Sequence, residues 1–347
     1  MPLPAPDQDV LHRDGRAPAR WGRMTRMGLL RHVFLLLAPV VVLLTACSSG
    51  GGRQATGSST PGSATASTDA AADRDGPVDI GDGREIYLKC SGTGSPTVVL
   101  VSGLGDSAEI WSTAADRTNP NPTVYGDVAK FSRVCAYDRP GTSGSRSTAV
   151  AQPTSAQTSA DDLEKVLTAS GETAPFVLVG HSYGGPIIRL FASDHPIQVG
   201  GLVLVDALSE DLQAGLTGEE QAVFEDLNAP PPQPGAEFFD LNTVVTELRQ
   251  SSLVPDVPVT VLTADIPQLT PELLASGQLP PGVDQAFADA LWAAQMAAQN
   301  DLPAKFQHAV HITNTRSDHY IQLGNPRLVI DSILETVDDV RSTERSR

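Results

Sequence analysis

Short apolar runs alternate with amphipathic helical patterns from residue 77 onward. The run PTVVLVSG at 96–103 shows no polar alternation, as expected of a strand that is covered on both faces. The segment 158–171 places its leucine and valine side chains on one helical face and ends at a glycine, which commonly terminates a helix. This alternation predicts an α/β fold: a mostly parallel central sheet flanked by helices.

The same patterns assign the remaining elements. We expect strands at 84–90, 96–103, 132–138, 176–180, 201–206, 258–264 and 308–315, and helices at 158–171, 184–196, 283–299 and 326–337. The interval 207–257 breaks the alternation with a Pro-rich stretch and two short helical patterns, so we interpret it as an insertion or lid over the sheet. The interval 266–282 is expected to be a second long loop, and long loops in compact domains tend to be functional.

The first 46 residues have the features of an export signal. A basic stretch precedes the apolar run VFLLLAPVVVLL, and small residues follow it. This run is shorter than the roughly 20 residues of a membrane-spanning helix, so we expect residues 1–46 to be a signal peptide. The Pro-rich, partly acidic residues before Met24 are unusual for such a signal, which makes Met24 and Met27 alternative translation starts.

The motif LTAC at the end of this segment resembles the lipobox of bacterial lipoproteins. The resemblance implies lipidation of Cys47 and a protein exported and anchored on the outer face of the bacterial cell membrane. The alternative is a plain signal peptide with an incidental cysteine. Residues 47–76 have almost no apolar bulk and are predicted to be a flexible tether. The globular domain is expected over 77–340, followed by a polar tail at 341–347.

The sequence LVGHSYGG places Ser182 between two glycines, after a predicted strand and before a predicted helix. A serine on such a tight strand-to-helix turn projects its hydroxyl from the edge of the sheet, and the glycines relieve contacts with neighbouring chain. The alternative is a structural glycine-rich turn. The flanking strand and helix favour a nucleophile.

A serine hydroxyl needs a base at neutral pH, and an acid usually orients that base. His319 lies in a predicted loop between the last strand and the last helix, at the same sheet edge as Ser182, and is our candidate base. Asp206 and Asp265 both follow strands at this edge and are candidate acids, although either could be a turn former. Tyr183 and Leu104 are predicted to supply the backbone N–H groups of an oxyanion hole.

Together these segments resemble the α/β-hydrolase fold serine hydrolases of the esterase, lipase and peptidase type. The resemblance rests on VVLVSGLG, RVCAYDRPGTSGS, LVGHSYGG, GLVLVDA and SDHYIQLGNP, which follow the family's order over about residues 78–340. The sequence departs from the family where Ser102 replaces the common histidine before Gly103. It also lacks the family's usual acid pattern near Asp265. Some family lipases carry the acid one strand earlier, which favours Asp206.

The resemblance also implies a position for the two remaining cysteines. Export permits a disulfide. In this fold the strands that hold Cys90 and Cys135 are antiparallel neighbours, so a Cys90–Cys135 disulfide is expected, with two buried free thiols as the alternative. Asp138 and Arg139 in YDRPG are expected to fix their loop rather than perform chemistry.

We therefore expect a serine hydrolase that acts on a small-molecule or lipid ester through an acyl-enzyme and needs no cofactor or metal. Alternatives are a peptidase such as a proline iminopeptidase, a haloperoxidase-like enzyme, an acyltransferase, or a ligand-binding protein on a hydrolase scaffold. The formal net charge of −17 argues against binding to nucleic acid. The natural substrate and the oligomeric state are left open.

Overall fold

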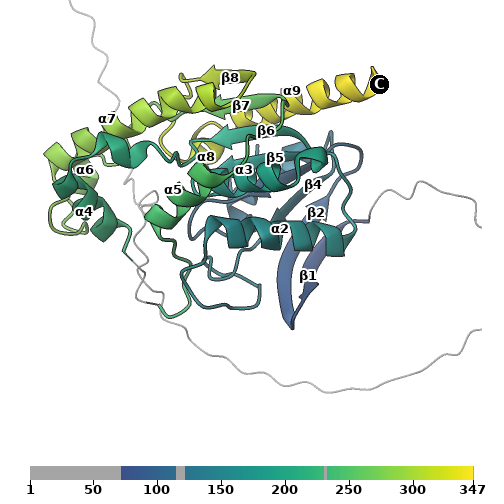
Figure 1. Ribbon diagram of the computed structural model, residues 1–347, viewed down its shortest axis with the longest axis horizontal. Coiled ribbons are helices and arrows are strands. Elements are labelled where there is room, and N and C mark those ends of the chain that lie inside the picture. The colour runs from purple at the N-terminus through teal and green to yellow at the C-terminus, as the bar shows by residue number, and fades with distance from the viewer. Residues whose placement is uncertain (1–71, 115–121, 230–232, 347) are drawn as a thin grey trace, which may run out of the picture. The chain divides into compact units, whose positions relative to one another are not determined.

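An eight-stranded sheet lies at the centre of the protein (Figure 1). The computed structural model describes residues 72–114, 122–229 and 233–346, all within one structural unit. The strand order is β1-β2-β4-β3-β5-β6-β7-β8. Strand β2 is antiparallel to both β1 and β4, and every other pair is parallel, which confirms the predicted mostly parallel sheet.

The strands lie close to their predicted positions, with one addition at the N-terminal end. Their bounds are β1 (Arg74–Gly81), β2 (Arg84–Ser91), β3 (Thr97–Val101), β4 (Val134–Tyr137), β5 (Phe176–His181), β6 (Val199–Val205), β7 (Val259–Leu262) and β8 (Ala309–Ile312). All residues of β3, β4 and β5 are buried. This agrees with the continuous apolar runs that predicted central strands.

The helices of the described residues are mostly those expected, with short additional turns. Their bounds are η1 (Ala108–Ser112), α1 (Val124–Val128), α2 (Ala156–Ser170), α3 (Gly184–Asp194), η2 (Pro196–Gln198), η3 (Leu212–Gly215), α4 (Gly218–Leu227), α5 (Leu241–Gln250), α6 (Pro271–Leu274), α7 (Gln285–Asp301), η4 (Leu302–Lys305), α8 (Ile321–Gly324) and α9 (Pro326–Arg345). Within the ranges that the structure describes, none of these combines the length and apolar character needed to cross a bilayer.

The core has two parts because the helices cover both faces of the sheet. Side chains of α2, α3 and α5 pack with Val99 and Val101 of β3 on one face. Side chains of α1 and α9 pack with Val98 and Leu100 on the other. Alternate residues of one buried strand therefore serve opposite faces, as the pleat of a strand requires.

Two predicted boundaries differ from the structure. Strand β1 begins at Arg74, inside the segment 47–76 that we predicted as tether, because its backbone pairs along β2 although most of its side chains are partly or fully exposed. Helix α9 continues through most of the predicted tail 341–347. Arg341 anchors this end by donating to the carbonyls of Ser95 and Phe131, both at 2.8 Å. The predicted signal peptide 1–46, Cys47 and most of the tether lie outside the described residues.

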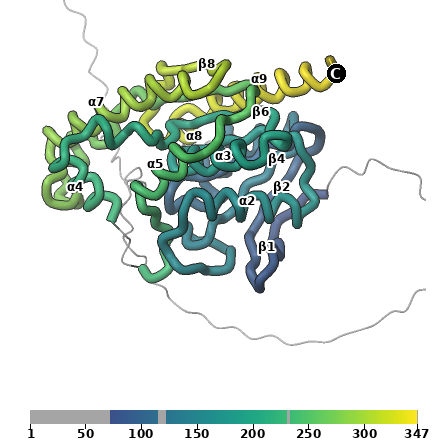
Figure 2. Tube along the Cα trace, viewed as in Figure 1, coloured from purple at the N-terminus to yellow at the C-terminus, as the bar shows by residue number. Residues whose placement is uncertain are grey.

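The predicted insertion at 207–257 contains η3, α4 and α5, so its two helical patterns are confirmed. The second predicted loop, 266–282, carries the single-turn helix α6. Figure 2 traces α4 beside the N-terminal half of α7, and the two helices are in contact.

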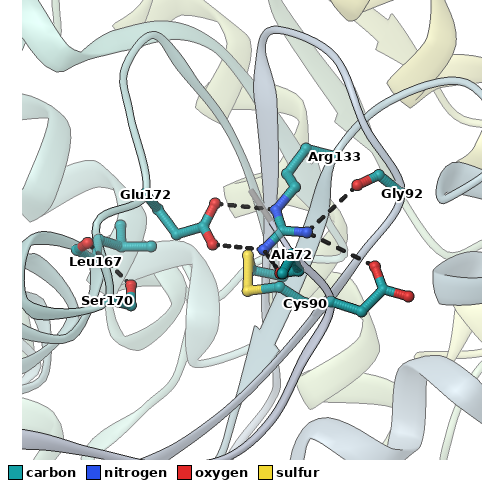
Figure 3. The surroundings of a disulfide bond; sticks show 9 residues. Ala72, Cys90, Gly92, Arg133, Leu167, Ser170 and Glu172 are labelled. Carbon is teal, nitrogen blue, oxygen red and sulfur yellow. Dashed lines mark hydrogen bonds and ion pairs between the residues drawn. A yellow bond between two sulfur atoms is a disulfide. The ribbon is translucent and has the colours of Figure 1, made fainter. Parts of the chain in front are cut away.

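Cys90 of β2 and Cys135 of β4 face each other in the antiparallel register, as expected. Their sulfur atoms are 2.07 Å apart, which is bonding distance, and both side chains are buried. Figure 3 shows the buried pair of Arg133 and Glu172 beside them, joined by two hydrogen bonds of 2.8 and 3.2 Å. The pairing of strands that the resemblance implied is thus present.

Candidate active site

Ser182 lies on a sharp turn between β5 and α3. Its φ angle is +51°, in the left-handed region that a non-glycine residue rarely adopts. Its N–H donates to the Val205 carbonyl at 3.1 Å. A side chain at Gly180 would lie 2.6 Å from the Gly184 carbonyl, and one at Gly184 would lie 2.3 Å from that of Val101. The turn therefore requires both glycines, as the sequence predicted, and holds the serine in a strained conformation typical of functional sites.

His319 lies in the loop between β8 and α8, where the sequence predicted it. Its Nδ1 atom is 2.6 Å from Oδ2 of Asp206, the residue that directly follows β6. The Asp206 side chain is fully buried, and that of His319 is 11% exposed. A hydrogen bond this short between an imidazole and a buried carboxylate fixes the ring and leaves Nε2 for proton transfer.

Two further donors hold the Asp206 carboxylate in place. The Ala264 N–H donates to Oδ1 at 3.0 Å, and the Gln295 side-chain amide donates to Oδ2 at 2.9 Å. Gln295 lies on α7, and sequence reasoning missed it. The signal was present, because Gln295 follows Ala294 directly and lies four residues after Leu291 on the predicted inner face of that helix. A polar residue beside an apolar helix face often reaches a buried polar partner.

The alternative acid, Asp265, makes no hydrogen bond or ion pair with His319 in the described structure. Its Oδ1 atom accepts the Ser317 N–H at 3.0 Å and the Thr315 hydroxyl at 3.4 Å. Asp265 therefore stabilises the loop that leads to His319, which is the turn-forming role that we considered for both aspartates. Asp265 comes three residues after the end of β7, whereas Asp206 directly follows β6, and at that position its carboxylate bonds the Thr315–Ser317 segment.

His181, the residue before Ser182, supports the same loop. Its Nε2 atom lies 2.9 Å from the His319 carbonyl, which can only accept, so Nε2 carries the proton. Burial lowers the pKa of His181 well below its usual value, and the neighbouring His319 lowers it further. His181 is therefore a neutral side chain that holds the backbone of His319, with the two rings 4.7 Å apart.

The loop after β3 lies directly against the serine. A side chain at Gly103 would meet Nδ1 of His181 at 2.8 Å and Cβ of Ser182 at 3.2 Å. The backbone can approach this closely only because residue 103 is glycine. The two predicted oxyanion donors, the N–H groups of Leu104 and Tyr183, therefore come from the loop that contacts the serine and from the residue that follows it.

Asp106 is a further acidic group at this site that sequence reasoning did not assign. Burial raises the pKa of its carboxyl to about 7, while Arg139 and His319 oppose the shift. Burial raises the pKa of Tyr320 well above its usual value, and the charges of Asp106 and Asp318 raise it further. The charge of His319 acts on this carboxyl, although no hydrogen bond joins the two side chains in the described structure.

Chemically, the site brings together a strained serine, an imidazole held by a carboxylate, and a glycine-containing loop against the serine. These are the parts that nucleophilic catalysis on an acyl group uses. The one cluster of possible metal ligands found in the described part of the chain, Cys90, Cys135 and Glu172, belongs to the sulfur pair on β2 and β4 and not to this site.

Sequence comparison relates the chain to a known family. The sequence profile of the "Alpha/beta hydrolase family" matches residues 98–332. The chain is 30% identical over 141 residues to "Probable transporter efuK" of Hormonema carpetanum, covering 39% of this chain and 19% of that protein. It is 34% identical over 116 residues to "Putative carbamate hydrolase RutD" of Caulobacter segnis, covering 33% of this chain and 39% of that protein. The chain thus spans less than half the length of these relatives.

Among solved structures, a thermophilic esterase from Thermogutta terrifontis resembles the protein with a TM-score of 0.49 and 16% identity. The match covers 77% of this chain and 99% of that one.

Proposed function

Because the chain belongs to the alpha/beta hydrolase family and has its fold, we propose that it is a serine hydrolase that cleaves carboxylic esters through an acyl-enzyme. Ser182 is the nucleophile, His319 the general base and Asp206 the residue that orients the base. The observation that carries this proposal is the 2.6 Å contact between His319 Nδ1 and Asp206 Oδ2, at the sheet edge where Ser182 occupies its strained turn.

In the first half of the reaction, Ser182 Oγ attacks the ester carbonyl carbon while His319 Nε2 takes the hydroxyl proton. Asp206 holds the opposite nitrogen and stabilises the imidazolium that forms. The N–H groups of Leu104 and Tyr183 donate to the oxyanion of the tetrahedral intermediate. When the intermediate collapses, His319 Nε2–H protonates the departing alkoxide, and the acyl group remains on Ser182.

The second half reverses these roles with water. His319 Nε2 removes a proton from a water molecule, whose oxygen attacks the acyl-enzyme carbonyl. The same two amides bind the second oxyanion. Collapse returns the proton to Ser182 Oγ and releases the carboxylic acid.

A second candidate substrate class is carbamates, which present the same carbonyl to the same machinery. It is favoured by the relatives named as carbamate hydrolases, which are 33–35% identical over about a third of this chain. The choice between classes would depend on the insertion at 207–257 and on the segment 266–300, since both lie outside the central sheet.

The test is a substrate panel with the wild-type protein and Ser182→Ala. The panel contains p-nitrophenyl acetate, butyrate and decanoate, an aryl carbamate and a prolyl p-nitroanilide. We expect the wild type to hydrolyse at least one of the esters and Ser182→Ala to lose about 10⁴-fold or more in kcat. Turnover of the anilide alone would support the peptidase alternative. Equal activity of the two proteins would contradict the proposal.

We further propose that the protein is exported and anchored on the outer face of the bacterial cell membrane by a lipid on Cys47. The LTAC motif described above supports this proposal. Expression of the full chain with a radiolabelled fatty acid tests this. Label in the wild type and its loss in Cys47→Ala would support the anchor. An unlabelled wild type, released into the medium, would contradict it.

A further inference from the structure

The loop that carries Leu104 is held by a buried ion pair. Arg139 Nη1 donates to the Ser102 carbonyl at 2.8 Å, and its Nη2 donates to the Gly103 carbonyl at 2.6 Å. The Glu237 carboxylate accepts the Gly105 N–H at 2.7 Å. Three backbone groups on the two sides of Leu104 are therefore fixed by one pair of side chains.

These contacts determine where the Leu104 N–H points. The Gly103 carbonyl and the Leu104 N–H belong to the same planar trans peptide, so they point in opposite directions. Because Arg139 holds the carbonyl, the N–H is aimed to the opposite side of the peptide. The next peptide joins Leu104 to Gly105. The Glu237 carboxylate fixes this peptide by accepting the Gly105 N–H. A rotation of either plane would break a charge-assisted hydrogen bond.

The ion pair is buried and tightly bonded. Arg139 and Glu237 are each 2% exposed and share two hydrogen bonds of 2.6 and 3.0 Å. Burial lowers the pKa of Arg139, but the Glu237 carboxylate outweighs this effect, so the pKa lies above its usual value. A buried guanidinium without its partner would be strongly unfavourable. The hydrogen bonds from Arg139 to the loop therefore depend on Glu237.

Glu237 comes from the insertion, at a point where the insertion docks on the loop after β4. Its own N–H donates to the Gly141 carbonyl at 2.7 Å. A side chain at Gly141 would lie 2.5 Å from the Gly235 carbonyl, so the two loops touch through backbone. Two residues later, the Phe239 ring stacks on that of Tyr183 with centroids 4.5 Å apart. The segment 237–239 thus contacts Tyr183 and the residue that follows Leu104.

We propose that Glu237, acting through Arg139, is a positioning residue that aligns the oxyanion hole, and that the insertion thereby controls transition-state binding. The inference rests on the proposed function, because it assigns Leu104 N–H to the oxyanion. The inference concerns transition-state binding, because the hydrogen bonds of the Glu237 carboxylate go to Arg139 and to the Gly105 N–H and not to Ser182 or His319.

The chain offers a matched control. Arg189 of α3 and Glu210 of the insertion form a second buried bidentate pair, with hydrogen bonds of 2.7 and 2.9 Å. Both side chains are almost as buried as the first pair, and neither contacts the loop of Leu104. Glu210 also pairs with Lys305 at 3.0 Å, so Glu210→Gln should lose at least as much stability as Glu237→Gln. Misalignment of the loop should occur only in Glu237→Gln.

The experiment measures kcat and KM with the ester of the panel that the wild type hydrolyses fastest. It also measures inhibition by a boronic acid, which forms a tetrahedral adduct with the serine. We expect Glu237→Gln to lose about 10- to 100-fold in kcat, with a parallel rise in the inhibition constant and KM within about threefold. We expect Glu210→Gln to keep all three values within about threefold while losing thermal stability. Glu237→Asp, which keeps the charge, should recover part of the loss in kcat. If Glu237→Gln does not fold, Glu237→Asp is compared with the wild type in its place.

Crystal structures of both variants separate this inference from the proposed function. We expect the peptide between Gly103 and Leu104 to be rotated in Glu237→Gln and unchanged in Glu210→Gln. An unchanged peptide, or a kcat of Glu237→Gln equal to that of Glu210→Gln, overturns the inference alone. If the wild type is inactive or Ser182→Ala is fully active, the proposed function fails, and the crystal structures still decide whether Glu237 aligns this peptide.

Discussion

His319 Nδ1 lies 2.6 Å from Asp206 Oδ2, although the two residues are 113 positions apart in the chain. The contact exists because β6 and β7 are parallel neighbours and β8 follows β7, so the loops after β6 and β8 meet at one sheet edge. Ser182, at the end of β5, lies at the same edge. Catalysis by these three residues requires this convergence.

Replacing Asp206 by Asn tests the role of this contact. Asn keeps the shape but cannot stabilise the imidazolium, so we expect kcat to fall by about 10²–10⁴-fold. Asp265→Asn is the matched control. Its amide oxygen can still accept the Ser317 N–H, so activity should stay within about threefold. A larger loss in Asp265→Asn than in Asp206→Asn, measured by steady-state ester kinetics, would reverse the assignment of the acid.

Gln295 provides a milder test of the same carboxylate. Gln295→Ala removes one of the donors to Asp206, and we expect a decrease in kcat of about 3- to 10-fold with little change in folding. Gln285→Ala is the control, because Gln285 lies on the same helix but bonds the exposed Asp289. Equal kcat values in the two variants would show that Gln295 does not support the site.

The parts of the site that could be predicted from the sequence are those with a local signature. Ser182 lies in a glycine-flanked turn, and Asp206 and His319 follow strands at the edge where parallel strands end. The choice between Asp206 and Asp265 was harder, because both follow strands at this edge. The family resemblance favoured Asp206, and the direction of each side chain is visible only in the structure.

The residues that sequence reasoning missed act across long distances. Glu237 lies 98 positions from Arg139 and sits in a Pro-rich stretch with no helical or strand periodicity. Asp106 looks like an ordinary turn residue, and its unusual pKa arises from burial that only the folded chain creates. The two ends were also misjudged, because β1 and the last turns of α9 have polar sequences and are held by backbone pairing and by Arg341.

Asp106 should make stability depend on pH. Burial raises the pKa of its carboxyl to about 7, above the value of 3.8 expected for the group in water. The folded protein then binds more protons than the unfolded chain between about pH 4 and 7, so this group's contribution to stability falls as pH rises through that range. Asp106→Asn cannot ionise. We expect equal free energies of unfolding near pH 4 and a variant about 1–3 kcal/mol more stable at pH 8.

Urea denaturation of the wild type and Asp106→Asn across this range is the measurement. The exposed Asp82, in the turn between β1 and β2, supplies the control for the substitution: Asp82→Asn should not reproduce the gain in stability of Asp106→Asn at pH 8. An Asp106→Asn variant that is less stable than the wild type at pH 8 would show that the ionised carboxylate is favourable in the fold.

The sulfur pair at β2 and β4 predicts sensitivity to reductant. A bond between Cys90 and Cys135 would close a loop across 45 positions, so its removal should lower the free energy of unfolding by about 2–4 kcal/mol. We expect reductant to destabilise the wild type and to leave the Cys90→Ala/Cys135→Ala variant unchanged. If the wild type is equally stable with and without reductant, the two cysteines are free thiols in solution.

The most direct test of the central claim is covalent labelling of the nucleophile. The wild type is treated with a fluorophosphonate, digested and analysed by mass spectrometry. The account predicts one adduct on the peptide that contains Ser182, with its appearance and the loss of ester hydrolysis following the same time course, and no adduct in Ser182→Ala. An adduct on another residue that abolishes hydrolysis, or full hydrolysis by a wild type that remains unlabelled, would contradict it.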